Sequence, residues 1–115
     1  MITRQFDLWI ADLNPRRGTE AGKIRPVVVI QTDLLNKNHP SVVICPITTN
    51  VQPDSEILRV HLSKIRTKLK EDCDVMIDQI RTIDSRRLIK KVGEVDRQVR
   101  SKIKENLKIV LDLER

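Results

Sequence analysis

Aromatic side chains are almost missing from this 115-residue chain, which has one Trp, one Phe and no Tyr. Both aromatic residues, Phe6 and Trp9, stand near the N-terminus. Many proteins that bind single strands stack the bases on a row of aromatic rings, and this sequence offers no such row. Any contact with nucleic acid should therefore be mainly polar and ionic.

Cysteine and histidine are equally scarce, with two residues of each kind. Cys45 and Cys73 lack CxxC spacing and have apolar neighbours, which predicts reduced, buried thiols in place of a metal site. His39 and His61 are expected at the surface. No cluster of carboxylate, His or Cys residues has the spacing of metal ligands, so we expect neither a metal nor another cofactor.

Long hydrophobic runs are also absent. The first ten residues, MITRQFDLWI, contain neither the apolar core of a signal peptide nor the start of the roughly 20-residue apolar run of a membrane helix. We expect a cytoplasmic protein that does not enter a membrane.

Charge is the feature that the sequence has in excess. Charged residues make up 33% of the chain and hydrophobic residues 39%, against a usual hydrophobic share of roughly 45–50%. The 22 Lys and Arg residues outnumber 16 Asp and Glu, which gives a formal charge of +6. This excess favours a polyanionic partner such as nucleic acid, although it can also serve solubility alone. The length fits one domain, residues 1–115.

Hydrophobic patterning predicts a mainly β fold. Strands are expected at 7–13, 25–32, 41–49, 57–63, 73–83 and 92–95. A long polar loop fills 14–24, and residues 32–39 can form only a short helical connector. After the N-cap candidate Asp96, a helix is expected with one apolar face, made of Val99, Ile103, Leu107, Val110 and Leu111. Several short strands with little helix are typical of a small barrel.

Three strings of the sequence are distinctive together: DLNPRRGTEAGKIRPVVVI at 12–30, ICPITT at 44–49 and DQIRTIDSRRL at 78–88. In this order they resemble the motifs of the MazF/PemK toxin family. Those motifs are an Asp-Leu-x-Pro-x-x-Gly-Ser-Glu loop before Arg-Pro-Val, a Pro-Ile-Thr strand end and an Asp/Glu-Gln-Ile-Arg-Thr-Ile-Asp turn. The resemblance extends through nearly the whole chain.

The resemblance implies a fold and an activity. The fold is mainly β with a C-terminal helix, an SH3-like small barrel of the CcdB/PemK type that forms a homodimer. The activity is that of a type II toxin–antitoxin toxin, a sequence-specific, metal-independent endoribonuclease. Such an enzyme cuts single-stranded RNA by attack of a ribose 2′-hydroxyl, leaving a cyclic phosphate and a 5′-hydroxyl. A cognate acidic antitoxin is the implied partner.

The motifs also imply the catalytic residues. Arg25 precedes Pro-Val, Thr48 belongs to Pro-Ile-Thr, and Thr19 stands where the family usually has serine. Other readings are that Arg25 pairs with Glu20 or Asp78, that Thr48 is an ordinary strand residue and that Thr19 caps its own loop. Residues of the first and third motifs are expected to bind RNA: Arg16, Arg17, Glu20, Asp78, Gln79 and Arg81.

Arginine is a poor general base, because its pKa of roughly 12.5–13.8 makes the neutral form costly at pH 7. Arg25 is better suited to hold the phosphate oxygens with its guanidinium fork. Some family members use a histidine and an arginine at the positions of Thr19 and Met76, and that variant mechanism does not fit this chain. Asp78 is an alternative base if its pKa is raised, or else a partner of Arg25 or Arg81.

Two rival functions use the same fold or charge. CcdB-type toxins share the barrel but bind DNA gyrase and are not enzymes, so the fold alone does not separate the two activities. A generic basic RNA-binding module is the second rival. The pairing of Arg25 with Thr48 favours the nuclease over both.

Overall fold

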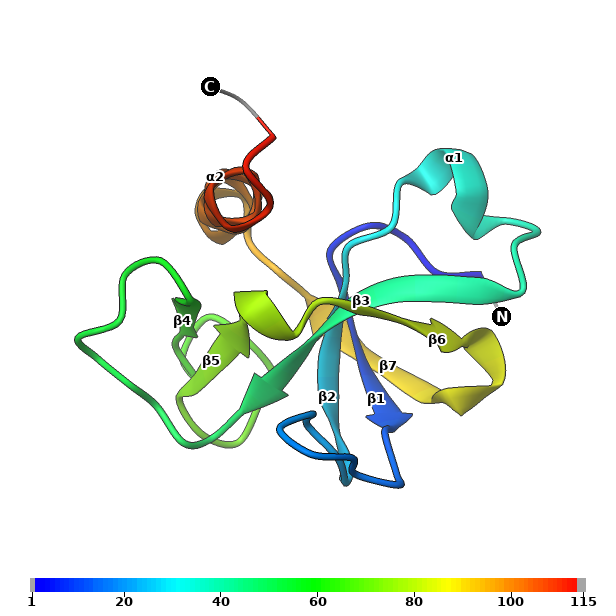
Figure 1. The fold of residues 1–115 in the computed structure, drawn as a ribbon, viewed down its shortest axis with the longest axis horizontal. Helices are drawn as coiled ribbons and strands as arrows, with labels where there is room; N and C mark the ends of the chain where they lie inside the picture. Colours follow the sequence, from blue (N-terminus) through cyan, green and yellow to red (C-terminus); the bar gives the residue numbers. More distant parts are fainter. Residues whose placement is uncertain (1, 114–115) are drawn as a thin grey trace.

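The computed structural model describes residues 2–113 and contains a strongly bent sheet with a long C-terminal helix (Figure 1). Residues 1, 114 and 115, the ends of the predicted domain, lie outside the described part. The elements follow in the order β1 (Asp7–Asp12), β2 (Ile24–Val29), α1 (Asp33–Asn36), β3 (Ser41–Thr48), β4 (Arg59–Leu62), β5 (Cys73–Met76), η1 (Ile77–Gln79), β6 (Arg81–Asp84), η2 (Ser85–Arg87), β7 (Leu88–Glu94) and α2 (Arg97–Leu111). The two η elements are single turns of 3₁₀ helix.

All strand pairs are antiparallel, and the strands lie in the order β4-β5-β3-β2-β1-β7, with β6 also paired to β3. The mainly β class with one C-terminal helix is confirmed. Over residues 2–113 the path ends at β4 and β7, and β6 forms a further edge beside β3.

Strand β3 is the centre of the sheet because β5 and β6 share one of its edges. Residues Ser41–Ile44 pair with β6, whereas Ile47 and Thr48 pair with β5. Pro46, which has no N–H to donate, lies between the two pairings. The proline therefore marks a change of partner within a continuous strand.

The predicted strand at 73–83 is wrong as a single element. It is interrupted by η1, and the register along β3 shifts by three residues between its pairing with β5 and its pairing with β6. The three residues of η1 account for that shift. Asp78 and Gln79, two predicted site residues, lie in this turn and are therefore not paired within the sheet.

The last predicted strand, 92–95, is too short, since β7 begins at Leu88. This edge strand pairs only with β1, through two register irregularities, and Ile89, Lys90 and Lys91 are exposed. Few of its residues face the core, so the sequence of this strand shows little regular alternation of apolar and polar side chains. The other predicted strands are present, with ends displaced by at most three residues.

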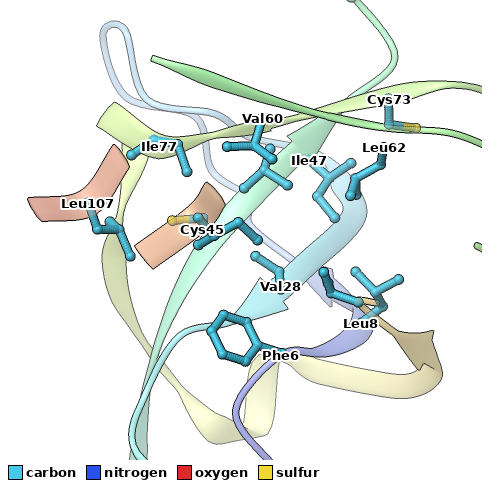
Figure 2. Packing of buried hydrophobic residues seen from close by; sticks show 13 residues of the cluster. Phe6, Leu8, Val28, Cys45, Ile47, Val60, Leu62, Cys73, Ile77 and Leu107 are labelled. Atoms are coloured by element: carbon cyan, nitrogen blue, oxygen red, sulfur yellow. The ribbon is translucent and has the colours of Figure 1, made fainter. Parts of the chain in front are cut away.

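The interior contains two apolar clusters. Alternate residues of β2 contribute to them, with Val28 in the first cluster and Val27 and Val29 in the second. Figure 2 shows the first cluster, which joins Phe6 to residues from the sheet and from α2. Cys45 and Cys73 belong to it, and both are free and buried, as predicted.

Helix α2 begins as predicted, because Asp96 accepts a hydrogen bond from the Val99 N–H at 3.0 Å. Ile103 and Leu107 are buried in the first cluster, beside β4 and η1 (Figure 1). Leu111 was expected on the same face but is 46% exposed, since the helix ends there. Helix α1 is a single turn. No helix within residues 2–113 is long and apolar enough to cross a membrane.

Candidate active site

The loop between β1 and β2 is closed at its base by two hydrogen bonds between its own ends. Leu13 donates to the Lys23 carbonyl at 2.9 Å, and the Lys23 N–H donates to the Asn14 side chain at 2.9 Å. Within the loop Gly18 has a φ of +57°, a left-handed conformation that glycine adopts without strain. A Cβ on Gly22 would lie 2.6 Å from the Cβ of Arg16, so only glycine allows this close approach.

Side chains of η1 and of the start of β6 contact the backbone of this loop. Gln79 accepts a hydrogen bond from the Ala21 N–H at 3.2 Å and donates one to the Thr19 carbonyl at 3.1 Å. Arg81 makes a longer contact, 3.5 Å, with the Ala21 carbonyl. The first and third motifs, nearly 60 residues apart, therefore form one structure.

Arg25 lies at the start of β2, where the loop rejoins the sheet. Its Nε donates to the Gly22 carbonyl at 2.7 Å, and its Nη1 lies 3.5 Å from the Ile47 carbonyl. Within residues 2–113 no carboxylate forms an ion pair with Arg25, so the pairing with Glu20 or Asp78 considered above is absent. Burial, and then the charge of Arg16, hold the pKa of Arg25 below its usual value.

Thr48 is the last residue of β3 and is half-buried. The β2–β3 ladder pairs Val27 with Pro46, and continuing it by two residues sets Arg25 opposite Thr48. Side chains directly opposite in an antiparallel pair project from the same face, with Cβ atoms about 4.5–5.5 Å apart. The Thr48 hydroxyl accepts a hydrogen bond from the Asn50 N–H at 3.1 Å, which leaves its own proton available to a ligand.

A cavity of about 210 Å³ opens between the loop and the turn after β5. It is lined by Arg16, Thr19, Glu20, Ala21, Gly22, Lys23, Arg25, Met76 and Gln79. Three of these side chains are cationic and one is a carboxylate. Because burial and Arg16 already disfavour the charge on Arg25, an anion in the cavity would relieve an existing repulsion. The cavity therefore has the electrostatics of a phosphate site.

The structure brings together most of the predicted site residues. The cavity is lined by Arg16, Thr19, Glu20, Arg25 and Gln79. Arg81 does not line it but contacts the backbone of the loop. Arg17 and Asp78 do not line it and are exposed. Asp78 is paired with neither Arg25 nor Arg81. The Thr19 hydroxyl makes no hydrogen bond to the loop within the described residues, so the capping role considered above is absent.

Sequence reasoning missed two groups around the site. Arg87 donates to the carbonyls of Asp12 at 3.1 Å and Asn14 at 2.6 Å, and so fixes the start of the loop. The end of β3 is flanked by a buried carboxylate, Asp74. The signal for Arg87 was its place in the third motif, whereas nothing in the local pattern distinguished Asp74. No group of three or more His, Cys, Asp or Glu residues in the described chain could hold a metal ion.

Comparison with known proteins places these features in a family. Residues 4–111 match the family described as PemK-like, MazF-like toxin of type II toxin–antitoxin system. Endoribonuclease EndoA from Bacillus subtilis (strain 168) is 36% identical over 113 residues, which cover 98% of this chain and 97% of that protein.

Two solved structures share the fold. MazF (Form-I) from Deinococcus radiodurans has a TM-score of 0.82 at 22% identity, over 97% of this chain and 98% of its own. An endoribonuclease in complex with its cognate antitoxin, from Mycobacterial species, has a TM-score of 0.77 at 20% identity, over 99% and 97%. The family match covers nearly the whole described chain. The chain belongs to the family of PemK-like, MazF-like toxins of type II toxin–antitoxin systems.

Proposed function

We propose that this toxin is a sequence-specific endoribonuclease that cuts single-stranded RNA, with Arg25 and Thr48 acting on the scissile phosphate. One observation carries the proposal: the register of the β2–β3 ladder, continued by two residues, sets Arg25 opposite Thr48, and Arg25 lines a cavity with two further cationic side chains. The Bacillus subtilis relative is named an endoribonuclease, which supports the activity. The match to the MazF-like family does not favour the CcdB-like alternative of gyrase binding.

The reaction that fits this site is an internal transesterification. The ribose 2′-oxygen forms a bond to the adjacent phosphorus, and the bond from phosphorus to the 5′-oxygen of the next nucleotide breaks. The 2′-hydroxyl loses a proton and the 5′-oxygen gains one, so the products are a 2′,3′-cyclic phosphate and a 5′-hydroxyl. Since the nucleophile is part of the substrate, the step needs no metal-activated water and no cofactor.

Arg25 would bind the phosphate oxygens. Its Nε is already directed by the Gly22 carbonyl, and the guanidinium keeps its charge at neutral pH. One preorganised donor to developing negative charge is worth on the order of 10²–10³ in rate. Burial, and then the charge of Arg16, lower the pKa of Arg25, and a bound phosphate would supply the opposite charge that this guanidinium lacks.

Thr48 would donate a hydrogen bond from its hydroxyl to the phosphate or to the leaving 5′-oxygen. The Asn50 N–H occupies an acceptor position of the hydroxyl, and this fixes the rotamer that the proton must use. Thr19 lines the cavity with a hydroxyl that no loop atom engages, so it suits an additional contact to phosphate. Alignment of the 2′-oxygen with the leaving oxygen would lower the barrier by several kcal/mol more, up to about 7–11 kcal/mol in ideally oriented reactions.

RNA on either side of the scissile bond would contact the remaining predicted residues. Arg16 and Arg17 are exposed and unpaired within residues 2–113, as phosphate contacts require. Glu20 and Asp78 are also exposed, and their carboxylates can accept hydrogen bonds from base edges. Gln79 and Arg81 already bind the loop backbone, so their main contribution would be to hold the loop in place for RNA.

We propose the same assembly and control for this chain as the resemblance implies. It would act as one domain, residues 1–115, in a cytoplasmic homodimer. An acidic antitoxin would neutralise it, which fits the formal charge of +6. The Mycobacterial structural neighbour is solved in complex with its cognate antitoxin. A partly disordered acidic tail could cover the cavity by offering carboxylates in place of RNA phosphates.

The proposal is tested by incubating the purified chain with a mixed RNA in EDTA and mapping the new 5′ ends. The expected result is cleavage at one short sequence, with 5′-hydroxyl ends that can be phosphorylated without prior dephosphorylation. Intact RNA under these conditions, or cleavage that leaves 5′-phosphate ends, would overturn the proposed reaction. Gyrase inhibition without RNA cleavage would instead revive the CcdB-like alternative.

A further inference from the structure

Asp74 is a fully buried carboxylate, 0% exposed, for which the reaction described above has no use. It lies on β5 and pairs directly with Thr48 of β3 on one side and with His61 of β4 on the other. Figure 1 shows these three strands side by side. A charged group that is removed from water is costly unless it is well paired, so its partners indicate why it is there.

Three donors surround the two oxygens of Asp74. The Gln52 N–H donates to Oδ2 at 2.8 Å, the Arg59 Nη1 donates to Oδ2 at 3.2 Å, and the His61 Nδ1 contacts Oδ1. A carboxylate only accepts hydrogen bonds, which places the proton of the imidazole on Nδ1. Gln52 belongs to the segment that leaves β3 after Thr48, and Arg59 begins β4, where that segment ends.

A continuous path of contacts leads from Asp74 back to Thr48. The Nη1 atom of Arg59 also donates to the Asn50 carbonyl at 3.0 Å, so one guanidinium bridges Asp74 and Asn50. The Asn50 N–H then donates to the Thr48 hydroxyl at 3.1 Å. The residue that orients the Thr48 hydroxyl is itself held by the buried ion pair.

We propose that Asp74 is a positioning residue for RNA cleavage, which acts through Arg59 and Asn50 to fix the hydroxyl of Thr48. Asp74 is 0% exposed, so it does not itself contact RNA. This role rests on the proposed function, because it gives Asp74 a share in catalysis only if Thr48 acts on the phosphate. Misplacement of a reacting group by about 1 Å can cost on the order of 100-fold in rate, so a loosened Thr48 should be detectable in kcat.

The test substitutes Asp74→Asn in the full chain and measures kcat and KM on an RNA that contains the mapped cleavage site. Asparagine keeps the shape of the side chain but presents an NH₂ group to neighbours that are all donors. We expect kcat to fall about 10- to 100-fold with KM changed less than about threefold. Equal losses from the matched control described next would overturn the proposal.

Asp7→Asn is the matched control. Asp7 is 2% exposed and, like Asp74, has three donors: the Arg4 N–H at 2.9 Å, the Trp9 indole N–H at 3.2 Å and Lys91 at 3.2 Å. It lies at the start of β1, away from Thr48. Asp7→Asn should lower the melting temperature as Asp74→Asn does, while kcat per folded molecule stays at the wild-type value.

A double-mutant cycle with Thr48→Ala separates positioning from a general loss of structure. If Asp74 acts through Thr48, Asp74→Asn should lower the residual rate of the Thr48→Ala variant by less than about threefold. The same 10- to 100-fold loss in both backgrounds, which would show that the two residues act independently, overturns the proposal. A fully active Thr48→Ala variant would instead remove Thr48 from the proposed function, and that result is visible before any Asp74 variant is made.

Amide exchange in the RNA-free protein gives a readout that does not depend on cleavage. Asp74→Asn should accelerate exchange at the amides of Asn50 and Gln52, and Asp7→Asn should not. Unchanged protection at both amides would contradict the positioning path.

If Asp74→Asn does not fold, the same tests can be made with Arg59→Gln. The Arg59 side chain is 13% exposed, and Asp74 would keep two of its three donors in this variant. Wild-type kcat in Arg59→Gln would then overturn the proposal.

Discussion

The Nη1 atom of Arg25 lies 3.5 Å from the carbonyl oxygen of Ile47, the residue before Thr48. This contact joins the end of the polar loop to the end of β3 and sets a cation beside a hydroxyl. Arg25 and Ile47 are 22 positions apart in the sequence and belong to different motifs. The antiparallel register of β2 and β3, continued to these positions, sets Arg25 opposite Thr48, the pair that we propose to act on the phosphate.

Removal of either member of the pair should abolish most of the activity. Arg25→Ala and Thr48→Ala are each expected to lose at least about 100-fold in kcat, because each removes a donor to the charge that develops on the phosphate. Arg25→Lys should recover little, since an ammonium lacks the planar fork. Single-turnover cleavage measures the loss, and circular dichroism confirms folding. Near wild-type rates in the two Ala variants would move the active site elsewhere.

Gln79→Ala should loosen the loop between β1 and β2. The substitution removes two hydrogen bonds to the loop backbone, each worth about 0.5–1.5 kcal/mol. We expect faster proteolysis within residues 14–22 in the absence of RNA, and a KM raised about tenfold, because RNA binding must then order the loop. Gln5→Ala is the control, since the Gln5 side chain donates to the Ile30 carbonyl at 2.9 Å, away from the loop. Equal proteolysis of this loop in both variants would contradict the role of Gln79.

Cys45 should make stability fall at alkaline pH. Burial, and then the charge of Asp78, raise the pKa of its thiol to about 12, whereas a thiol in an unfolded chain titrates near 8.5. The folded state therefore keeps a proton that the unfolded state loses, and this stabilisation is complete below about pH 8.5 and disappears as the pH rises toward 12. At pH 10 the loss amounts to about 2 kcal/mol.

Urea unfolding at pH 7.5 and pH 10 measures this effect. The Cys45→Ala variant should lose clearly less stability between the two pH values than the wild type, although it is less stable at both because of the cavity that it creates. The sequence contains no Tyr, which removes one group that would otherwise titrate in this range. An identical pH slope in wild type and variant would show that the thiol ionises equally in both states.

RNA and an acidic antitoxin tail should compete for the cavity. Binding of a non-cleavable RNA analogue, followed by fluorescence anisotropy, should weaken with salt by a slope of about 0.7 per phosphate neutralised. Arg16→Ala should reduce the slope by roughly one contact. The antitoxin peptide should displace the analogue stoichiometrically. If both ligands bind at once without weakening each other, the antitoxin does not inhibit by occupying the cavity.

Much of the site could be predicted because its residues lie in short motifs that the chain carries in order. Arg25, Thr48 and Thr19 were assigned from such motifs, and their roles stay predictions until variants are measured. The helical period placed Ile103 and Leu107 correctly in the core. These predictions share a basis, since each depends on a local pattern of the sequence.

Contacts between distant segments could not be predicted from the same patterns. Gln79 reads as a polar turn residue, and only the fold brings it to Thr19 and Ala21. Asp74 alternates with apolar residues in a strand, which by pattern alone predicts an exposed side chain. Its burial is compensated by contacts from Gln52, Arg59 and His61. These residues are 13 to 22 positions away in sequence, so no local pattern announces them. The break at η1 escaped notice because β5 and β6 both continue the apolar pattern.

The most direct test of the account uses a short RNA with a single 2′-deoxyribose immediately 5′ of the mapped scissile phosphate. The 2′-hydroxyl at this position is the proposed nucleophile, whereas Arg25 and Thr48 are proposed to align the phosphate and to stabilise the charge that develops on it. We expect no cleavage of the substituted RNA in EDTA, while the all-ribose RNA is cut and the substituted RNA still binds with similar affinity. Cleavage of the deoxy substrate at the same phosphate would contradict the account, because an external nucleophile would then be at work.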